Sequence, residues 1–206
     1  IAALRRRGFI PEAIKQLIFD IGITPVDSSL SWETLESYNR KFVDESANRY
    51  FFVMDPIELV VRGAPDMREA RLRLHPRQPE KGERILPLEH EDGGLKFYIS
   101  AKDAETLEEG QVFRLKDLMN VLLVTKGGTL EAEFQGLEVA DVPKIQWVSG
   151  GKVELEVIKP DTTVERGITE PTVAGLQPGD IIQFERYGFV RIDAVRPKLV
   201  AVYAHR

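Results

Sequence analysis

The sequence contains no cysteine, and this absence excludes disulfide bonds, thiolate nucleophiles and cysteine-ligated metal sites. Histidine is also scarce, because His75, His90 and His205 are the only three and lie too far apart for a metal-binding spacing. No apolar run reaches the roughly 18 residues that a membrane-spanning helix needs. A chain of this composition is typical of a cytoplasmic protein, and we expect that location and no contact with a membrane.

The sequence also lacks the motifs of the common catalytic centres. It has no Gly-x-Ser-x-Gly elbow, no phosphate-binding Walker loop and no dinucleotide fingerprint. Carboxylates are plentiful, but none is paired in an apolar setting that would indicate an acid–base couple. We therefore expect no catalytic residue, no metal site and no cofactor in this chain itself.

The start of the chain is unlike a secretion signal. Apolar residues at 1–4 precede three arginines at 5–7, whereas a signal peptide carries its positive charge before its apolar stretch. The first residue is Ile rather than Met. We therefore expect the sequence to be a piece of a longer protein.

The net charge of −5 is unevenly distributed along the sequence. Basic residues cluster at 5–7 and between 62 and 84, and acidic residues cluster at 103–109 and 131–133. A protein that reads a few unpaired bases with placed side chains can be acidic overall, whereas one that wraps a duplex usually cannot. Taken alone, such clusters are more typical of an ordinary solvated surface than of a binding site.

Helical patterns are confined mainly to the first quarter of the sequence. Pro11 suits the first turn of a helix, and Gly22 is placed to end it. Ser31 is the predicted N-cap of a second helix, and a loop is expected between the two at 24–29. The apolar faces that we expect to be buried are Ile14, Leu17, Ile18 and Ile21 in the first helix, and Leu35, Tyr38 and Phe42 in the second.

Short strands separated by turn signals dominate the rest of the sequence. The turn signals are Pro and Gly clusters such as those at 126–128, 178–180 and 196–197. The predicted strands are 50–54, 58–62, 95–99, 112–115, 121–125, 130–134, 152–158, 181–184, 190–194 and 199–203. So many short strands predict barrels or a sandwich, with one further helix near 101–109.

Five short motifs follow one another along the sequence in a recognisable order. They are Ala-Leu-Arg-Arg-Arg-Gly-Phe at 3–9, Val-Met-Asp-Pro at 53–56, His-Pro and Pro-Glu within 75–80, Ile-Gln-Trp-Val-Ser at 145–149 and Gln-Phe-Glu-Arg at 183–186. In this order and spacing they resemble the C-terminal half of the glutamyl- and glutaminyl-tRNA synthetases of class I. That half of such an enzyme binds tRNA, mainly at the anticodon, and performs no chemistry.

The resemblance implies a mainly β fold with an N-terminal helical segment. A helical connector would occupy 1–48, and two β-barrels that share strands and are interleaved in sequence would occupy 49–206. The parent protein would be an ATP-dependent glutamate–tRNA ligase that uses ATP and Mg²⁺ in its catalytic domain. The family's ATP-handling motifs, HIGH and KMSKS, are absent here. The implied partners are tRNA(Glu) and the catalytic domain of the same polypeptide.

The resemblance also assigns a site for the middle anticodon base. Arg49 aligns with an arginine that contacts this base in the glutaminyl enzymes, and Gln183 and Arg186 align with two further residues at the same base. An amide and two guanidinium groups suit the edge of an unpaired uracil, which offers two acceptors and one donor.

Two more basic groups are implied to contact tRNA. Arg114 and Lys116 align with residues that face the first anticodon base or neighbouring phosphates, although the family more often has arginine where Lys116 stands. Arg5, Arg6 and Arg7 belong to a segment that touches the inner side of the tRNA, where arginine forks match phosphate oxygens.

One departure from the glutaminyl pattern favours the glutamyl branch. The glutaminyl enzymes carry a basic cluster for the third anticodon base where this chain has Thr-Leu-Glu-Glu at 106–109. This difference favours the archaeal form of the glutamyl enzyme, which often charges tRNA(Gln) as well as tRNA(Glu). The glutaminyl branch and a β-barrel protein-interaction module with no RNA role are the alternatives.

Overall fold

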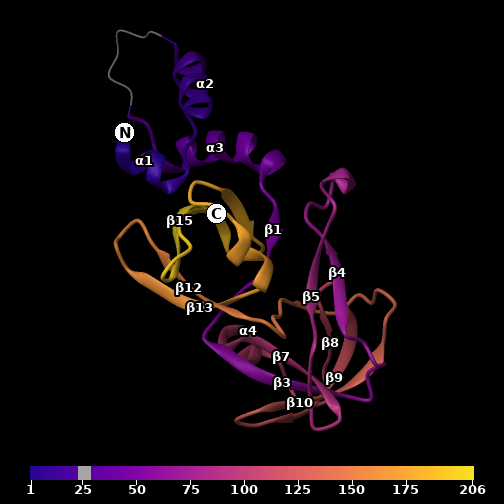
Figure 1. Cartoon of the computed structure of the whole chain (residues 1–206). Coiled ribbons are helices and arrows are strands. Elements are labelled where there is room, and N and C mark those ends of the chain that lie inside the picture. Colours follow the sequence, from indigo (N-terminus) through magenta and orange to yellow (C-terminus); the bar gives the residue numbers. More distant parts are fainter. Residues whose placement is uncertain (23–28) are drawn as a thin grey trace. The chain divides into compact units, whose positions relative to one another are not determined.

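The computed structural model describes residues 1–22 and 29–206, and the chain forms two compact units (Figure 1). Unit 1 consists of Ile1–Arg49, Glu156–Val164 and Leu176–Arg206. Unit 2 consists of Tyr50–Leu155 and Glu165–Gly175. The loop predicted at 24–29 lies almost entirely outside the described residues.

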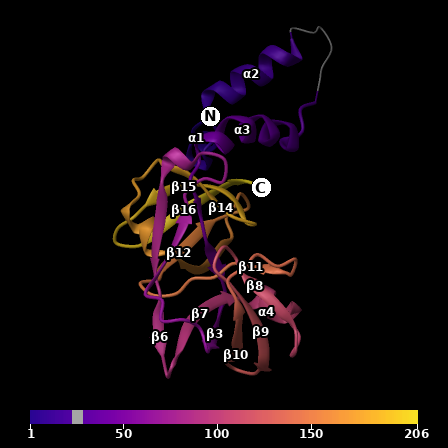
Figure 2. The ribbon, with the colours of Figure 1, turned by 90° about the vertical axis from the view of Figure 1, so that its right-hand side faces the viewer.

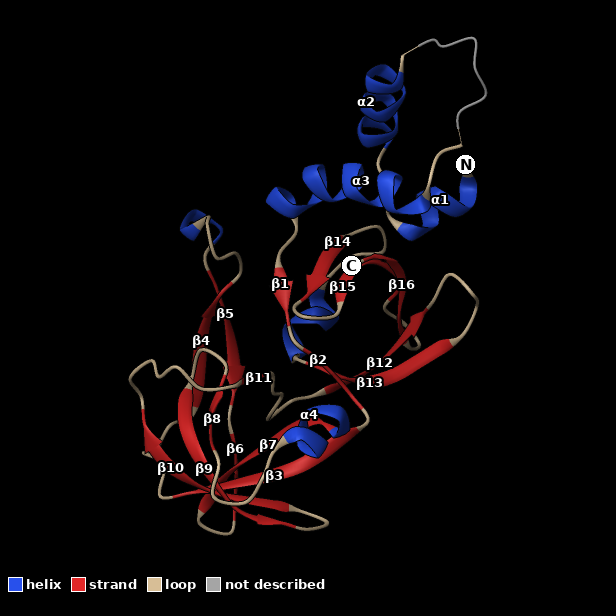
Figure 3. Ribbon diagram, turned by 180° about the vertical axis from the view of Figure 1, so that it is seen from behind, coloured by secondary structure: helices blue, strands red, loops and turns tan. Residues whose placement is uncertain are grey.

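Unit 1 begins with helices α1 (Ala2–Arg7), α2 (Pro11–Ile21) and α3 (Trp32–Ser46) (Figure 3). Pro11 occupies the first turn of α2, where its missing N–H leaves no hydrogen bond unmade, and Gly22 ends this helix with a φ of 70°. The Ser31 side chain caps α3 by accepting a hydrogen bond from the Thr34 backbone N–H at 3.2 Å. The predicted start and stop signals are thus confirmed.

The buried faces of these helices differ in part from the prediction. In α3, Leu35 is buried, but Phe42 is 39% exposed, and the buried stripe runs through Leu35, Asn39 and Val43. In the predicted face of α2, Leu17 is buried and Ile14 is half-buried, whereas Ile18 and Ile21 are exposed. Because the polar residue Asn39 lies at the centre of the buried stripe of α3, apolar spacing alone does not predict this face.

Asn39 is buried because its polar atoms have partners. Its Oδ1 accepts a hydrogen bond from the Ile10 backbone N–H at 3.0 Å, and its Nδ2 donates to the Gly8 carbonyl at 3.1 Å. The same Nδ2 lies 2.9 Å from Nε2 of His205, so the neutral imidazole can accept a hydrogen bond there. Asn39 thereby ties α1, α2 and the end of the chain to α3.

His205 is fully buried in unit 1, with two aromatic rings against its imidazole, those of Phe9 and Phe189. Burial lowers the pKa of His205 from 6.5 to about 4, because it disfavours the charged ring. The folded protein therefore binds fewer protons at this residue than the unfolded chain does between these two pH values.

This pKa predicts a pH-dependent stability. As pH falls from about 6.5 to about 4, protonation of the unfolded chain should remove on the order of 3 kcal/mol from the unfolding free energy. Urea titrations across this range should show a shallower pH dependence for His205→Gln than for the unmodified protein. The exposed His90 supplies the control, and an equal loss of slope in His90→Gln and His205→Gln would contradict the assignment.

The strands of the C-terminal part of unit 1 form an antiparallel meander of β14 (Ile181–Phe184), β15 (Gly188–Ala194) and β16 (Leu199–His205). Val43 and Ala47, at the end of α3, pack against Phe189 and Ala204 of this meander. The meander belongs to a seven-stranded sheet with the order β1-β14-β15-β16-β12-β13-β2. Its other strands are β1 (Arg49–Tyr50), β2 (Phe52–Met54), β12 (Val153–Ile158) and β13 (Val164–Thr169).

Unit 2 contains a second seven-stranded sheet, which curls into a nearly closed barrel with the order β11-β8-β9-β10-β3-β7-β6 (Figure 2). Its strands are β3 (Pro56–Arg62), β6 (Glu89–Glu91), β7 (Gly94–Ser100), β8 (Val112–Leu115), β9 (Met119–Lys126), β10 (Leu130–Gly136) and β11 (Lys144–Ile145). The short helices are α4 (Ala101–Thr106), η1 (Pro79–Lys81) and η2 (Pro171–Gly175). The predicted mainly β fold, preceded by N-terminal helices, is thus confirmed.

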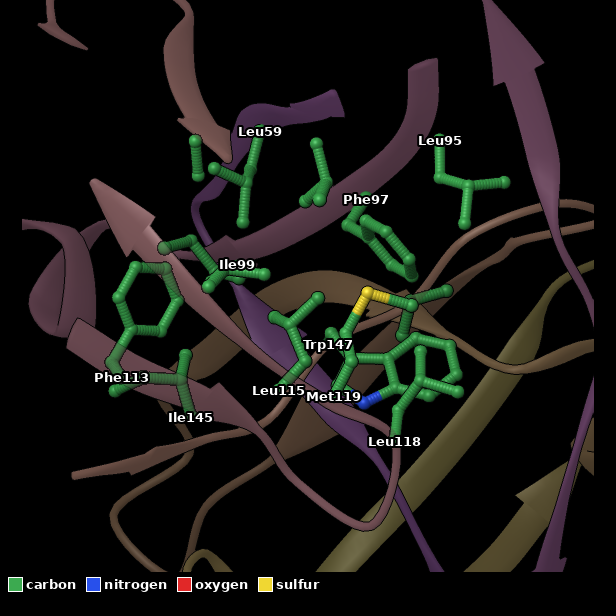
Figure 4. Close-up of a cluster of buried hydrophobic side chains, with 14 of the residues drawn as sticks. Leu59, Leu95, Phe97, Ile99, Phe113, Leu115, Leu118, Met119, Ile145 and Trp147 are labelled. Atoms are coloured by element: carbon green, nitrogen blue, oxygen red, sulfur yellow. The ribbon is translucent and has the colours of Figure 1, made fainter. Parts of the chain in front are cut away.

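Trp147 anchors the core of unit 2 (Figure 4). Its side chain is fully buried, and the rings of Phe97 and Phe51 meet it edge-on at centroid distances of 5.3 and 5.9 Å. Such edge-to-face contacts add to the stabilisation from apolar burial. The motif at 145–149 is therefore explained in part by packing.

The sequence patterns missed a two-stranded ribbon formed by β4 (Glu69–Arg73) and β5 (Glu83–Pro87). Both strands alternate exposed and buried residues, which is the period of a half-buried strand. Charged residues occupy so many of these positions that the sequence alone indicates a basic cluster between 62 and 84 and not two strands. Strands β6, β11 and β13 were also missed, and two of these have only two or three residues.

One arginine of the ribbon is buried. The side chains of Arg84 and Glu170 are 1% and 0% exposed, and Arg84 Nε lies 3.1 Å from Glu170 Oε2. Glu170 Oε1 accepts a hydrogen bond from the Phe51 backbone N–H at 2.8 Å, and Oε2 accepts one from the Thr172 hydroxyl at 3.0 Å. The two charges are therefore stabilised by each other and by the backbone of unit 2.

Removal of one partner of this pair should leave a buried, uncompensated charge. We expect Glu170→Ala to lower the unfolding free energy by about 3–5 kcal/mol. The matched exposed pair is Arg71 and Glu69, at 2.6 Å with side chains 60% and 45% exposed, and Glu69→Ala should cost less than about 1 kcal/mol. Equal losses in denaturant titrations of the two variants would contradict this account.

Candidate nucleic-acid interface

Arg49 and Gln183 are neighbours in unit 1 although they are far apart in the sequence. The Gln183 backbone N–H donates a hydrogen bond to the carbonyl of Asn48, the residue before Arg49, at 2.9 Å. This bond joins the segment that leaves α3 to strand β14, and β1 lies beside β14 in the sheet order. The structure thus brings together two of the three residues predicted to face the middle anticodon base.

Two polar atoms of this pair are buried without a hydrogen-bond partner among the described residues. They are Arg49 Nε and Gln183 Oε1, a donor and an acceptor. Asp44 holds the other end of the Arg49 guanidinium, with 2.7 Å between Arg49 Nη2 and Asp44 Oδ1. A buried polar atom without a partner costs roughly 1–3 kcal/mol.

Arg186 lies on the tight turn between β14 and β15, three residues after Gln183. Its backbone has a φ of 60°, and the Tyr187 N–H closes the turn on the Phe184 carbonyl at 3.1 Å. The turn requires Gly188, where φ is 147° and a Cβ atom would lie 2.6 Å from the His205 carbonyl oxygen. The bend that Gln183 and Arg186 need in order to approach one base is therefore present, and Arg186 is exposed.

Arg114, in strand β8 of unit 2, is buried and 6% exposed. Its guanidinium donates four hydrogen bonds, to Asn120 Oδ1 and to the carbonyls of Leu118, Leu137 and Glu138, at 2.8–3.4 Å. Contact with a base would require some of these bonds to break. Arg114 thus fixes the segment after β10.

Lys116 lies in the turn that follows β8. Its Nζ forms a 2.5 Å ion pair with Asp117, and its side chain is 24% exposed. The Asp117 backbone has a φ of 59°, which marks a tight left-handed turn. Lys116 is therefore partly exposed, whereas Arg114, two residues earlier in β8, is buried.

The three consecutive arginines of α1 have different surroundings. Arg7 donates to the carbonyls of Tyr203 and Ala204 and is largely buried, so it ties α1 to β16. Arg6 forms a 2.8 Å ion pair with Asp193 and, by this hydrogen bond, holds the pKa of Asp193 below its usual value. Arg5 is exposed, and its guanidinium has no hydrogen bond or ion pair with the described part of the chain.

Sequence reasoning missed two residues that hold the predicted contacts. Asp44 fixes Arg49, and Asn120 fixes Arg114 while also donating to the Glu138 carbonyl at 2.8 Å. An acidic residue five positions before Arg49 was a possible signal for the first. Asn120 gave no local signal, because its partner comes from the neighbouring strand.

Among the described residues, no group of three or more His, Asp or Glu side chains could hold a metal ion. Within the same residues, no helix has both the length and the apolar character needed to cross a membrane.

Comparison with known families identifies the class of protein. Two family models, both described as the anticodon-binding domain of the class I tRNA synthetases for Glu and Gln, match residues 47–135 and 144–193. Together they include every residue predicted to contact the anticodon. The chain belongs to this family of anticodon-binding domains.

Curated relatives define the branch. The glutamate–tRNA ligase of Pyrococcus furiosus is 45% identical over the whole of this chain, which corresponds to 36% of that protein. The glutamate–tRNA ligases of Methanopyrus kandleri and Methanothermobacter thermautotrophicus are 42% and 39% identical, again over the whole chain and over 37% and 36% of their own lengths. The chain thus spans little more than a third of these archaeal relatives and corresponds to the anticodon-binding region of a glutamate–tRNA ligase. The predicted family and glutamyl branch are confirmed.

Proposed function

We propose that this chain is the tRNA-reading part of an ATP-dependent glutamate–tRNA ligase and performs no chemistry itself. The parent protein would attach glutamate to tRNA(Glu), and in the archaeal manner to tRNA(Gln), with ATP and Mg²⁺ bound in a catalytic domain elsewhere in the polypeptide. The observation that carries this proposal is that two residues on adjacent strands, Arg49 and Gln183, each have a buried side-chain atom without a hydrogen-bond partner among the described residues, Nε and Oε1 respectively.

The hydrogen-bonding groups of this pair match the edge of an unpaired uracil. The N3–H of uracil is a donor, and its O2 and O4 are acceptors. Gln183 Oε1 would accept from N3–H, while Arg49 Nε–H and the guanidinium of Arg186 would donate to the two carbonyl oxygens. Asp44 orients Arg49 for this contact through its 2.7 Å ion pair. A flipped-out middle base would thus satisfy atoms that the described residues leave without partners.

Further contacts to the tRNA would come from the exposed Arg5 and the partly exposed Lys116. Arg5 is placed to bind a phosphate, since its guanidinium forms no bond with the described residues, whereas Arg6 and Arg7 are engaged with unit 1. Lys116 would contact the first anticodon nucleotide. Arg114 would support the same part of the site indirectly, in keeping with its four internal hydrogen bonds.

We also propose the domain division 1–48 and 49–206, with a helical connector followed by interleaved barrels. Within residues 1–22 and 29–48, three helices precede Arg49, and both compact units draw on separated parts of the sequence, which supports the interleaving. The helices and the C-terminal meander belong to the same compact unit. The helical connector would therefore pack on β15 and β16, although it is a separate segment of the sequence.

The proposed function predicts a base-specific loss for Arg186→Ala. In filter binding with the full-length protein, this variant should lose about 1–3 kcal/mol in affinity for tRNA with uridine in the middle anticodon position, and less for the other three bases. Arg5→Ala should weaken all four tRNAs by one factor, because phosphates carry no sequence.

A third variant separates recognition from stability. Gln183→Met keeps the length of the side chain but removes the unpartnered acceptor, so the unfolding free energy should not fall while uridine discrimination is lost. If Arg186→Ala and Gln183→Met weaken all four tRNAs equally, the shared pocket is wrong. If no variant changes tRNA binding, the alternative of a protein-interaction module regains support.

A further inference from the structure

Lys116 is held in place through its backbone in unit 2. Its N–H donates to the Ile145 carbonyl at 2.9 Å, and its own carbonyl accepts a hydrogen bond from the indole Nε1–H of Trp147 at 3.0 Å. Both partners belong to the buried segment around Trp147. The Cα position of Lys116 is therefore fixed by the core of the barrel.

The ammonium group of Lys116 lies over a buried aromatic ring, that of Phe51. Its Nζ lies 5.7 Å from the centroid of the Phe51 ring, within the range of a cation–π attraction. The ion pair with Asp117 restrains the same ammonium group. A lysine held on two sides loses less conformational entropy when it binds a ligand than a solvated lysine would.

Phe51 itself has little freedom. It is fully buried, its N–H donates to Glu170 Oε1 at 2.8 Å, and its carbonyl accepts from the Thr169 hydroxyl at 2.7 Å. The guanidinium of Arg84 lies 4.9 Å from the centroid of the same ring. Phe51 is thus a rigid apolar residue whose ring interacts with two cations.

We propose that Phe51 is a positioning residue for Lys116: its ring holds the ammonium group in the orientation that binds the first anticodon nucleotide of tRNA. This inference rests on the proposed function of Lys116. Because a lysine ammonium is a point charge on a flexible stem, its affinity for a phosphate or a base edge depends on such restraint more than that of a planar guanidinium does.

Phe97 offers a matched control. Like Phe51, it is fully buried and meets the Trp147 ring edge-on, at 5.3 Å. Among the described residues, no Lys or Arg side chain lies over the Phe97 ring. A change in the electron density of the Phe97 ring therefore affects the same core but no cation–π contact.

The test uses the full-length protein with trifluorophenylalanine placed at residue 51 or, as the control, at residue 97. Fluorine withdraws electron density from the ring face with little change of shape, so substitution at 51 should weaken binding of cognate tRNA about two- to fivefold. Substitution at 97 should leave the affinity unchanged. Phe51→Leu, which removes the aromatic face altogether, should weaken binding at least as much.

The same measurements in a Lys116→Ala background decide between the explanations. The effect of fluorination at 51 should vanish there, because the cation is gone. If it persists at full size, Phe51 acts through Arg84 or the core and the inference is overturned. If Lys116→Ala binds tRNA as tightly as the unmodified protein, Lys116 is not a contact and the inference also fails, while uridine discrimination at the middle base tests the wider function separately.

Discussion

The candidate site depends on one backbone hydrogen bond, from the Gln183 N–H to the Asn48 carbonyl. It joins the chain as it leaves α3 to strand β14, two segments that no local pattern connects. Through this bond Arg49 lies beside Gln183. Arg186 lies in the turn that joins β14 to β15. The buried contact between Asn39 and His205 also supports the arrangement, because it fixes α3 to β16.

The arginines of this chain show why a count of basic residues is a poor guide to its interface. Arg7, Arg84 and Arg114 are engaged with backbone carbonyls or with a buried carboxylate, and they stabilise the units. Arg5 and Arg186 are exposed. A chain with a net charge of −5 can still bind a polyanion. A few placed cations and two unpartnered buried atoms act at short distances, whereas the repulsion from remote acidic residues is screened by salt.

Much of the secondary structure could be predicted from the sequence because it has local causes. The cap at Ser31, the proline at the start of α2 and the turn signals between strands act over a few residues. The ribbon of β4 and β5 could not be recognised as easily, because its buried positions include Arg84, whose partner Glu170 is distant in the sequence. The burial of Arg114 and the neighbours Arg49 and Gln183 likewise arise from long-range strand pairing. That Arg49 and Gln183 belong to one site could be predicted only from the resemblance to a known family, and not from any local pattern.

The most direct test of the account is a crystal structure of the full-length protein bound to tRNA(Glu). The account predicts that the edge of the middle anticodon base lies within about 3 Å of both Arg49 Nε and Gln183 Oε1, with its N3–H directed at the amide oxygen. A complex in which the anticodon is bound but these two atoms contact no base would contradict it.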